Sequence, residues 1–222
     1  MKKISAENNF MYLFVSLLGF LFFTALLQEM TSQYIEEIYA CILFLVLVVG
    51  VHSVKSEKSW FWAVYFLSAL IVFIYFFKQF FPSHMADVFY LLILLVFFVG
   101  SFYLSYSQIL LEGKIDKNVL VGSIVLYLLL GLIWTMIYLI LLMIFPEAFH
   151  GIEVLSWQDN FTKVAYYSFV TLTTLGYGDV SPKNTLAEFF VYVEAIAGVF
   201  YMAIIVASIV SARLSQVQGQ NK

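Results

Sequence analysis

The chain has 222 residues, of which 63% are hydrophobic, 19% aromatic and only 11% charged, and its formal net charge is −3. A soluble domain of this length needs more polar residues to cover its surface, so the composition predicts a membrane protein. The chain has no basic cluster interleaved with aromatic residues, so nucleic acid is not an expected partner. Cys41 is the single cysteine, which excludes an intrachain disulfide and a CxxC metal or redox pair.

Six apolar runs along the chain are each close to the length of about 20 residues that a helix needs to cross a bilayer. In chain order, they are residues 10–27, 38–54, 60–77, 87–111, 119–145 and 185–213. The first run could imitate a signal peptide, but it is long and no small-residue cleavage site follows it. We therefore expect an all-α membrane protein in which six crossings place both termini on the same side.

The positions of the lysines and arginines indicate which side that is. If the termini are cytoplasmic, the inner side carries Lys2, Lys3, Lys55, Lys58, Lys114, Lys117, Arg213 and Lys222, and the outer side carries Lys78, Lys163 and Lys183. This excess follows the positive-inside rule, so we expect both termini to be cytoplasmic. The chain has no organellar targeting signal, and we expect a multi-pass protein of a prokaryotic cell membrane.

The connector formed by residues 147–182 differs from the others because it is long and only moderately apolar. Ser156 followed by Asp159 is typical of a capping box, which predicts a short helix that ends at about Leu172. Such a helix is too short to cross a bilayer. We therefore interpret the connector as a re-entrant loop.

The sequence TLTTLGYGD, residues 171–179, follows this short helix, and in it Gly176 and Gly178 flank Tyr177. Glycine permits backbone angles that other residues avoid, so successive carbonyls can face one axis instead of alternating. An ordinary surface turn is the alternative, which the helices expected on both sides disfavour. The segment TLGYG, residues 174–178, resembles the selectivity filter of potassium channels, where backbone carbonyls replace the water shell of the ion.

By this resemblance, the carbonyls of Thr174, Leu175, Gly176 and Tyr177 are K+ ligands, and the Thr174 hydroxyl adds the innermost one. Tyr177 should point outward and brace the ring, and Gly178 completes the filter. Leu175 stands where the common pattern has valine, a departure that keeps the carbonyl, so we expect selectivity to survive it. A ring of carbonyls needs four chains, which implies a homotetramer in contact with membrane lipids. K+ in the pore is the expected ion, with no organic cofactor.

The resemblance extends to the last apolar run, where EAIAG, residues 194–198, is followed by VFYMAIIVASIVSARL. This run is similar to the inner helix of bacterial channels of the two-helix pore family. Gly198 sits where such helices often bend, but it could equally be a glycine for close helix packing. Met202, Val206 and Val210, spaced by four, could line the cavity and inner gate or face neighbouring helices.

Glu194 is an ionisable residue inside a membrane helix, where a charge is costly. We expect it to pack behind the filter and to hydrogen-bond Ser168 or Thr171 of the short helix in its protonated form, because burial disfavours the charge. An ordinary helix-packing role is the alternative.

Asp179 occupies the place where related channels have an aspartate anchored behind the outer mouth. In some relatives its partner is a glutamate of the pore helix, but the matching position here is Val170. The hydroxyl of Tyr166 is the expected substitute.

A voltage sensor would carry regularly spaced arginines in its fourth helix, and residues 87–111 contain none. We therefore expect residues 1–113 to form a peripheral four-helix domain without voltage sensing and residues 114–222 to form the pore domain. The chain has no HExxH, Walker or GxSxG motif, so it is not expected to be an enzyme. A weakly selective cation channel, a transporter subunit and a nonconducting scaffold stay open as alternatives, as does a regulatory subunit.

Overall fold

The computed structural model describes residues 9–29, 66–67, 69–70, 73–74, 84–111, 117–153 and 155–220. Its elements in chain order are α1 (Asn9–Glu29), α4 (His84–Leu111), α5 (Lys117–Ile144), β1 (Phe149–His150), α6 (Trp157–Leu172), β2 (Ser181–Pro182) and α7 (Thr185–Gln220). The regular secondary structure of the described part is therefore helical except for one pair of two-residue strands.

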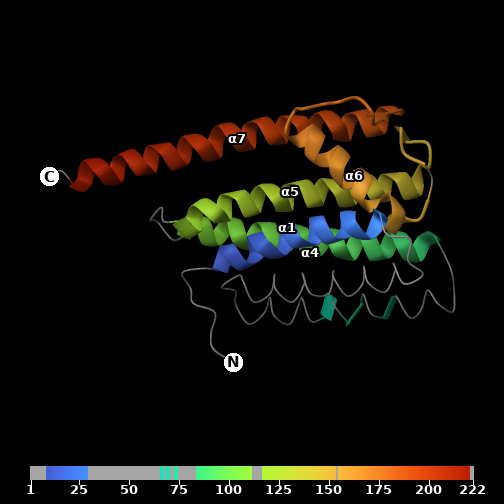
Figure 1. Cartoon of the computed structure of the whole chain (residues 1–222), viewed down its shortest axis with the longest axis horizontal. Coiled ribbons are helices and arrows are strands. Elements are labelled where there is room, and N and C mark those ends of the chain that lie inside the picture. Colours follow the sequence, from blue (N-terminus) through green and yellow to red (C-terminus); the bar gives the residue numbers. More distant parts are fainter. Residues whose placement is uncertain are drawn as a thin grey trace.

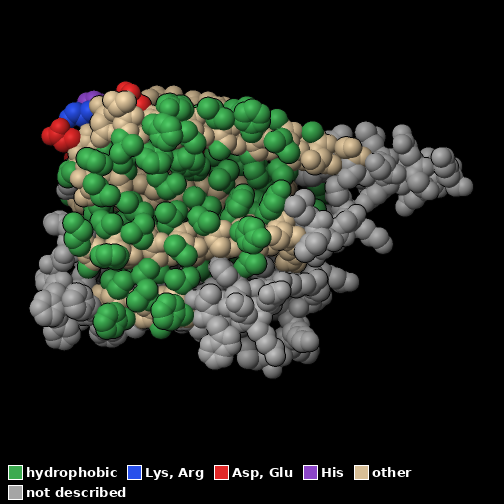
Figure 2. Space-filling view, turned by 180° about the vertical axis from the view of Figure 1, so that it is seen from behind, with side chains coloured by type: hydrophobic (Ala, Val, Ile, Leu, Met, Phe, Trp, Pro, Cys, Tyr) green, Lys and Arg blue, Asp and Glu red, His purple; other side chains and the backbone are tan. Residues whose placement is uncertain are grey.

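Among the described residues, four helices are long and apolar enough to cross a membrane. These segments are Phe10–Glu29, Met85–Ile109, Asn118–Ile144 and Thr185–Ile205, and each coincides with a predicted apolar run. The predicted run 38–54 lies outside the described residues, and of the run 60–77 only six positions are described, all of them helical. Figure 2 shows an almost wholly apolar face with the charged side chains gathered at one end, as a membrane-spanning surface requires.

Helices α1, α4 and α5 lie side by side, while α6 crosses obliquely between α5 and α7 (Figure 1). One buried hydrophobic cluster joins them, with members such as Leu17 of α1, Leu94 of α4, Leu139 of α5 and Phe161 of α6. Residues from both sides of position 113 thus share this core. The predicted peripheral and pore domains pack against each other within one chain.

Helix α6 begins as the sequence predicts. Ser156 is its N-cap, with extended backbone angles, and its hydroxyl accepts a hydrogen bond from the Asp159 backbone N–H at 3.2 Å. The Ser156 hydroxyl also donates to the Asp159 carboxylate at 2.6 Å. This cap satisfies a backbone donor at the start of α6, which then continues for 16 residues to Leu172. The short helix ahead of the glycine-rich segment is confirmed.

Two aromatic contacts join α6 to the N-terminal half of the chain. The rings of Phe20 in α1 and Phe161 in α6 meet edge to face, with their centroids 5.2 Å apart. The rings of Tyr90 in α4 and Trp157 in α6 are 5.0 Å apart. Such pairs add specific geometry to plain apolar contact. They hold the beginning of α6 against two helices that precede it by many residues.

Candidate functional site

The backbone of residues 174–178 alternates in the sign of φ. Thr174, Gly176 and Gly178 have φ values of +59°, +55° and +80°, whereas Leu175 and Tyr177 have the ordinary negative sign. A β-strand repeats one conformation, so its carbonyls point alternately to opposite sides. Alternation in the sign of φ instead allows successive carbonyls to turn toward one side. The two glycines adopt the positive φ without steric cost.

Thr174 is the one non-glycine residue with positive φ in the described part of the chain. A β-branched residue is strained there, and such strain persists only where the surroundings fix it. Backbone hydrogen bonds supply that fixation: the Thr174 N–H donates to the Thr171 carbonyl at 2.9 Å, and the Leu175 N–H donates to the Val170 carbonyl at 2.9 Å. The last turn of α6 therefore holds the start of the segment in place.

The segment faces open space in a single chain. The side chains of Leu175 and Tyr177 are 55% and 67% exposed, and a Cβ built on Gly176 or Gly178 would meet no atom within 4 Å. The segment therefore presents two large side chains and a strained backbone at the surface of the single chain.

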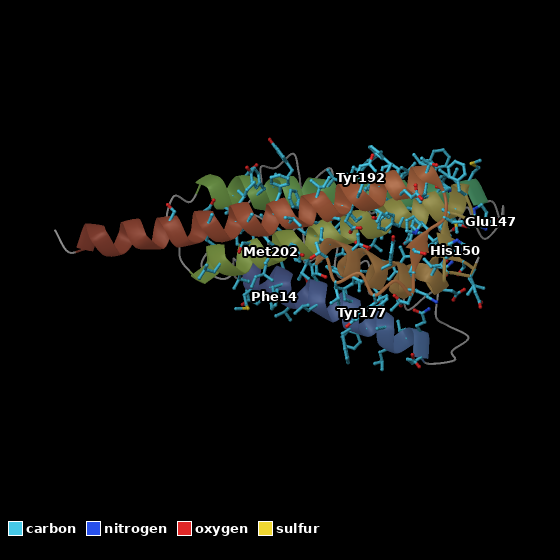
Figure 3. The ribbon with its side chains drawn as sticks, turned by 90° about the horizontal axis from the view of Figure 1, so that it is seen from above. Phe14, Glu147, His150, Tyr177, Tyr192 and Met202 are labelled. Atoms are coloured by element: carbon cyan, nitrogen blue, oxygen red, sulfur yellow. The ribbon has the colours of Figure 1, made fainter. Side chains whose placement is uncertain are left out.

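Tyr166 of α6 supports the far end of this segment. Its ring stacks on that of Tyr177, with the planes 10° apart and the centroids 6.5 Å apart. Its hydroxyl interacts with the carboxylate of Asp179, the pairing that the sequence suggests. Figure 3 shows Glu147 and His150 at one end of the molecule and Tyr177 farther from that end. Because α6 ends at Leu172 and Asp179 lies beside Tyr166, the segment runs back along α6.

A short structure, here called the outer clasp because Lys183 is predicted to lie on the outer side, holds the chain on the far side of Asp179. It consists of β1 paired antiparallel with β2, together with Glu147 and Lys183. The Lys183 N–H donates to the Ala148 carbonyl at 2.8 Å, and the Lys183 ammonium lies 2.6 Å from the Glu147 carboxylate. The hydrogen bond and charge of Lys183 lower the pKa of the exposed Glu147.

Gly151 shows how closely the outer clasp approaches the segment. Its φ is +81°, and a Cβ at this position would overlap the carbonyl oxygen of Asp179. Only glycine satisfies both requirements without distortion. Sequence reasoning missed the clasp, because two-residue strands leave no periodic pattern to detect.

Glu194 is fully buried where α5, α6 and α7 meet. Its carboxyl Oε1 lies 2.6 Å from the Ser168 hydroxyl, and its Oε2 accepts a hydrogen bond from the Tyr138 hydroxyl at 2.5 Å. The predicted contact with Ser168 is therefore present. Both carboxyl oxygens of Glu194 thus have a partner other than Thr171, the alternative that the sequence offered. Tyr138 was missed, since nothing in its apolar run marks it as the partner of a residue in another helix.

Gly198 lies against the end of α6. A Cβ at this position would overlap the carbonyl oxygen of Leu172, which also accepts a hydrogen bond from the Tyr127 hydroxyl at 3.1 Å. This geometry favours the close-packing interpretation of Gly198, and a bending role stays a prediction.

Of the three residues predicted to line the cavity and gate, Met202 of α7 is half exposed, at 51%. Val206 and Val210 belong to the same helix, but their side chains lie outside the described residues. The gate assignment therefore stays a prediction.

Comparison with known proteins gives a match to a family model and matches to curated proteins. Residues 123–213 match the family model described as ion channel. Over 84 residues, the chain is 34% identical to the A-type voltage-gated potassium channel KCND3 of Rattus norvegicus, and equally to those of Homo sapiens and Mus musculus. That match covers 36% of this chain and only 13% of each relative. No solved structure matches the chain.

The matched region contains α6, the alternating segment and the membrane-crossing part of α7. The four apolar helices and the match together support a membrane protein in which residues 123–213 are similar to an ion-channel domain. The chain spans far less than two thirds of the length of the curated relatives.

Proposed function

We propose that the chain is one subunit of a potassium-selective channel whose filter is formed by residues 174–178. The alternating φ along this segment carries the proposal, since it is the conformation that lets consecutive carbonyls face one ion path. The family match and the 34% identity to a potassium channel support it. The relatives are much longer proteins than this chain, so their names support the proposal only for the matched region.

In this proposal the carbonyls of Thr174, Leu175, Gly176 and Tyr177 replace the water shell of a dehydrated K+ ion, and the Thr174 hydroxyl contributes the innermost ligand. The protein supplies only dipoles, so ions pass from site to site without covalent chemistry. Bracing by Tyr166 and the outer clasp would keep the carbonyl spacing constant.

One chain contributes one filter segment, so a closed ring of carbonyls requires a homotetramer. Two features of the single chain support this assembly. The filter segment is exposed, and α7 presents exposed apolar side chains such as Phe189, Ile196 and Phe200. In a tetramer, neighbouring subunits would cover part of these surfaces and lipid the remainder.

Helix α6 would also favour cations electrostatically. Its C-terminal end directly precedes Thr174, and a helix C-terminus carries a partial negative charge. Four such ends around one axis would stabilise a cation on the inner side of the filter. Anions would be repelled there.

Conduction is proposed to be passive and independent of voltage. Helix α4 contains no lysine or arginine, whereas a voltage sensor moves several positive charges through the membrane field. The gating stimulus is left open. We assign residues 1–113 to a peripheral domain and both termini to the cytoplasm on the sequence argument alone.

The proposal is tested by reconstituting the purified chain in liposomes and measuring K+ and Na+ flux. We expect K+ flux well above Na+ flux, and in Gly176→Asp a fall to the level of empty liposomes, because a side chain and a charge would enter the filter. Leu175→Val is the matched control, since it keeps the carbonyl and should keep the flux. Equal K+ and Na+ flux would favour the weakly selective channel, and no flux from an intact oligomer would favour the scaffold.

A further inference from the structure

Three helices meet at one chain of hydrogen bonds behind the proposed filter. Tyr138 of α5 contacts Glu194 of α7 at 2.5 Å, and Glu194 contacts Ser168 of α6 at 2.6 Å. The Ser168 hydroxyl continues the chain to the backbone carbonyl of Gly131 in α5, at 2.9 Å. This chain of hydrogen bonds thus begins and ends on α5, and it links α6 to both α5 and α7.

The protons available to these groups restrict the state of Glu194. The Gly131 carbonyl can only accept, and the Ser168 hydroxyl has one proton to donate. If Ser168 donates to Gly131, the proton between Ser168 and Glu194 has to come from Glu194. Tyr138 then donates to the other carboxyl oxygen, and each of the three contacts holds one proton.

If Glu194 is ionised, one of the three contacts has no proton. Both Glu194 oxygens would then be acceptors, so Ser168 would donate to Glu194 and present only lone pairs to the Gly131 carbonyl 2.9 Å away. Thr135 also donates to this carbonyl, at 2.7 Å, and cannot relieve that contact. The ionised form therefore sets two acceptors against each other in a buried site.

Among the described residues, no positively charged group acts on Glu194 to offset its ionisation. Its side chain is 0% exposed, and the titratable groups that face it among the described residues are the tyrosines Tyr127, Tyr138 and Tyr167. Within the described residues, Lys183 forms an ion pair with Glu147, and this pair lies at the exposed outer clasp. A carboxylate without a cationic partner is costly to bury, and a neutral acid avoids that cost.

We propose that Glu194 is held as a neutral carboxylic acid that donates to Ser168 and accepts from Tyr138, and that this chain positions α6. Ser168 lies one helical turn before Leu172, the last residue of α6. Because Ser168 is hydrogen-bonded to both α5 and α7, α6 cannot move along its axis without breaking these hydrogen bonds. Glu194 and Tyr138 are then positioning residues, which act on the filter through α6. The effect on ion flux rests on the proposed channel function, whereas the protonation state does not.

Infrared spectroscopy of the purified protein labelled with 13C-glutamate tests the protonation state directly. We expect a C=O stretching band of a protonated carboxyl group at neutral pH, absent in Glu194→Gln. Glu188→Gln is the matched control, because Glu188 is an exposed glutamate of the same helix, and the band should persist in it. Absence of the band from the wild-type protein would overturn the proposal.

Flux measurements test the positioning role. Glu194→Gln keeps one donor and one acceptor in the same shape, so we expect a K+/Na+ flux ratio close to wild type. Glu194→Leu removes both, and the ratio should fall several-fold. If the two variants lose selectivity equally, the neutral hydrogen-bonded form is not what matters and the proposal fails.

A pH titration adds a readout that general loss of packing would not give. As the pH is raised until the infrared band disappears, the flux ratio of the wild-type protein should fall in parallel, while that of Glu194→Gln should not. A fall of equal size in both proteins would contradict the role of Glu194. If the wild-type protein conducts no K+ at all, the proposed function fails, yet the infrared result still decides the state of Glu194.

Discussion

Two glycines in apolar helices, Gly19 and Gly198, have opposite surroundings. A Cβ on Gly198 would overlap the Leu172 carbonyl oxygen, whereas a Cβ on Gly19 would meet no atom within 4 Å. Gly198→Ala should therefore force α7 away from the end of α6 and destabilise the protein by about 1–3 kcal/mol, the usual cost of overpacking. Gly19→Ala should be neutral or slightly stabilising, by about 0.5–1 kcal/mol, since alanine favours a helix.

Unfolding in a mild detergent, followed by circular dichroism, gives both free energies. Equal effects of the two substitutions would show that Gly198 does not serve close packing. A selectivity change in Gly198→Ala without loss of stability would instead favour the bending role.

The Glu147–Lys183 pair gives a pH prediction at the outer clasp. Lys183 lowers the pKa of Glu147 from its ordinary 4.5, so the carboxylate binds its proton less readily in the folded state than in the unfolded one. Such a pair contributes stability above the unfolded pKa, and the contribution disappears as the pH falls through the folded pKa. The effect should be small because both side chains are exposed to solvent.

Melting temperatures of the wild-type protein and Glu147→Gln, measured at low salt, check this prediction. The wild-type protein should melt slightly higher near neutral pH, and the difference should vanish in acid and shrink in high salt. A difference that grows in acid would contradict the assignment of this pair.

At the scale of single residues, a contact could be predicted where the sequence itself carries a local signal for it. The Ser156 cap depends on a residue three positions away, and the Glu194–Ser168 contact follows from a costly acid that needs a polar partner in the neighbouring short helix. Tyr138 was not predictable, because its pairing with Glu194 depends on how two distant helices pack. The positive φ of Thr174 was also missed, since only glycine announces that conformation.

Helix α1 contacts α5 near one of its ends and α6 near the other. The Phe10 backbone N–H donates to the Asn118 side chain at the start of α5, at 3.2 Å. Near its other end, the Gln28 amide donates to the Asp159 carbonyl in the first turn of α6, and Phe20 packs on Phe161 between these points. Helix α1 is therefore joined directly to α6, the helix that precedes the proposed filter.

This arrangement predicts different results for two phenylalanines of α1. Phe20 is 2% exposed and Phe22 is 64% exposed. Phe20→Ala should destabilise the protein by about 1–3 kcal/mol, less than the about 3–5 kcal/mol typical of soluble cores, because lipid already solvates apolar groups. Phe22→Ala should cost little, as it removes no buried contact.

Unfolding in detergent measures both variants, and their flux shows whether α1 affects conduction. A reduced flux in Phe20→Ala alone would show that α1 acts on the filter through α6. Equal destabilisation by the two substitutions would refute the contact between α1 and α6.

At the scale of elements, the long helices were predictable from apolar runs, and four of those runs coincide with described helices. Their ends were less certain: α7 continues to Gln220, beyond the predicted end at residue 213, since a helix can extend past its apolar stretch. The faces that α1 and α4 turn toward α6 could not be predicted, because helices that are apolar all round show no preferred side.

In a single chain, the surface that contains the proposed filter is not covered by other residues. The segment 173–179 is exposed, as are apolar side chains of α7 such as Phe189 and Phe200. Lipid can cover α7, but it cannot stabilise an irregular backbone such as that of the filter segment. The proposed ring of four subunits would resolve this difficulty, since each filter segment would then line a shared ion path.

Coexpression of wild-type and Gly176→Asp subunits tests this assembly in the conducting state. If one defective subunit blocks a pore, equal amounts that mix at random leave about one sixteenth of the wild-type flux for a tetramer, against about one quarter for a dimer and about half for independent subunits. We expect about one sixteenth, because every subunit contributes carbonyls to the same ring. The mass of the purified complex, expected near four times 25.5 kDa, supplies an independent check. A flux near half would mean that each chain conducts alone, which a single filter segment cannot do.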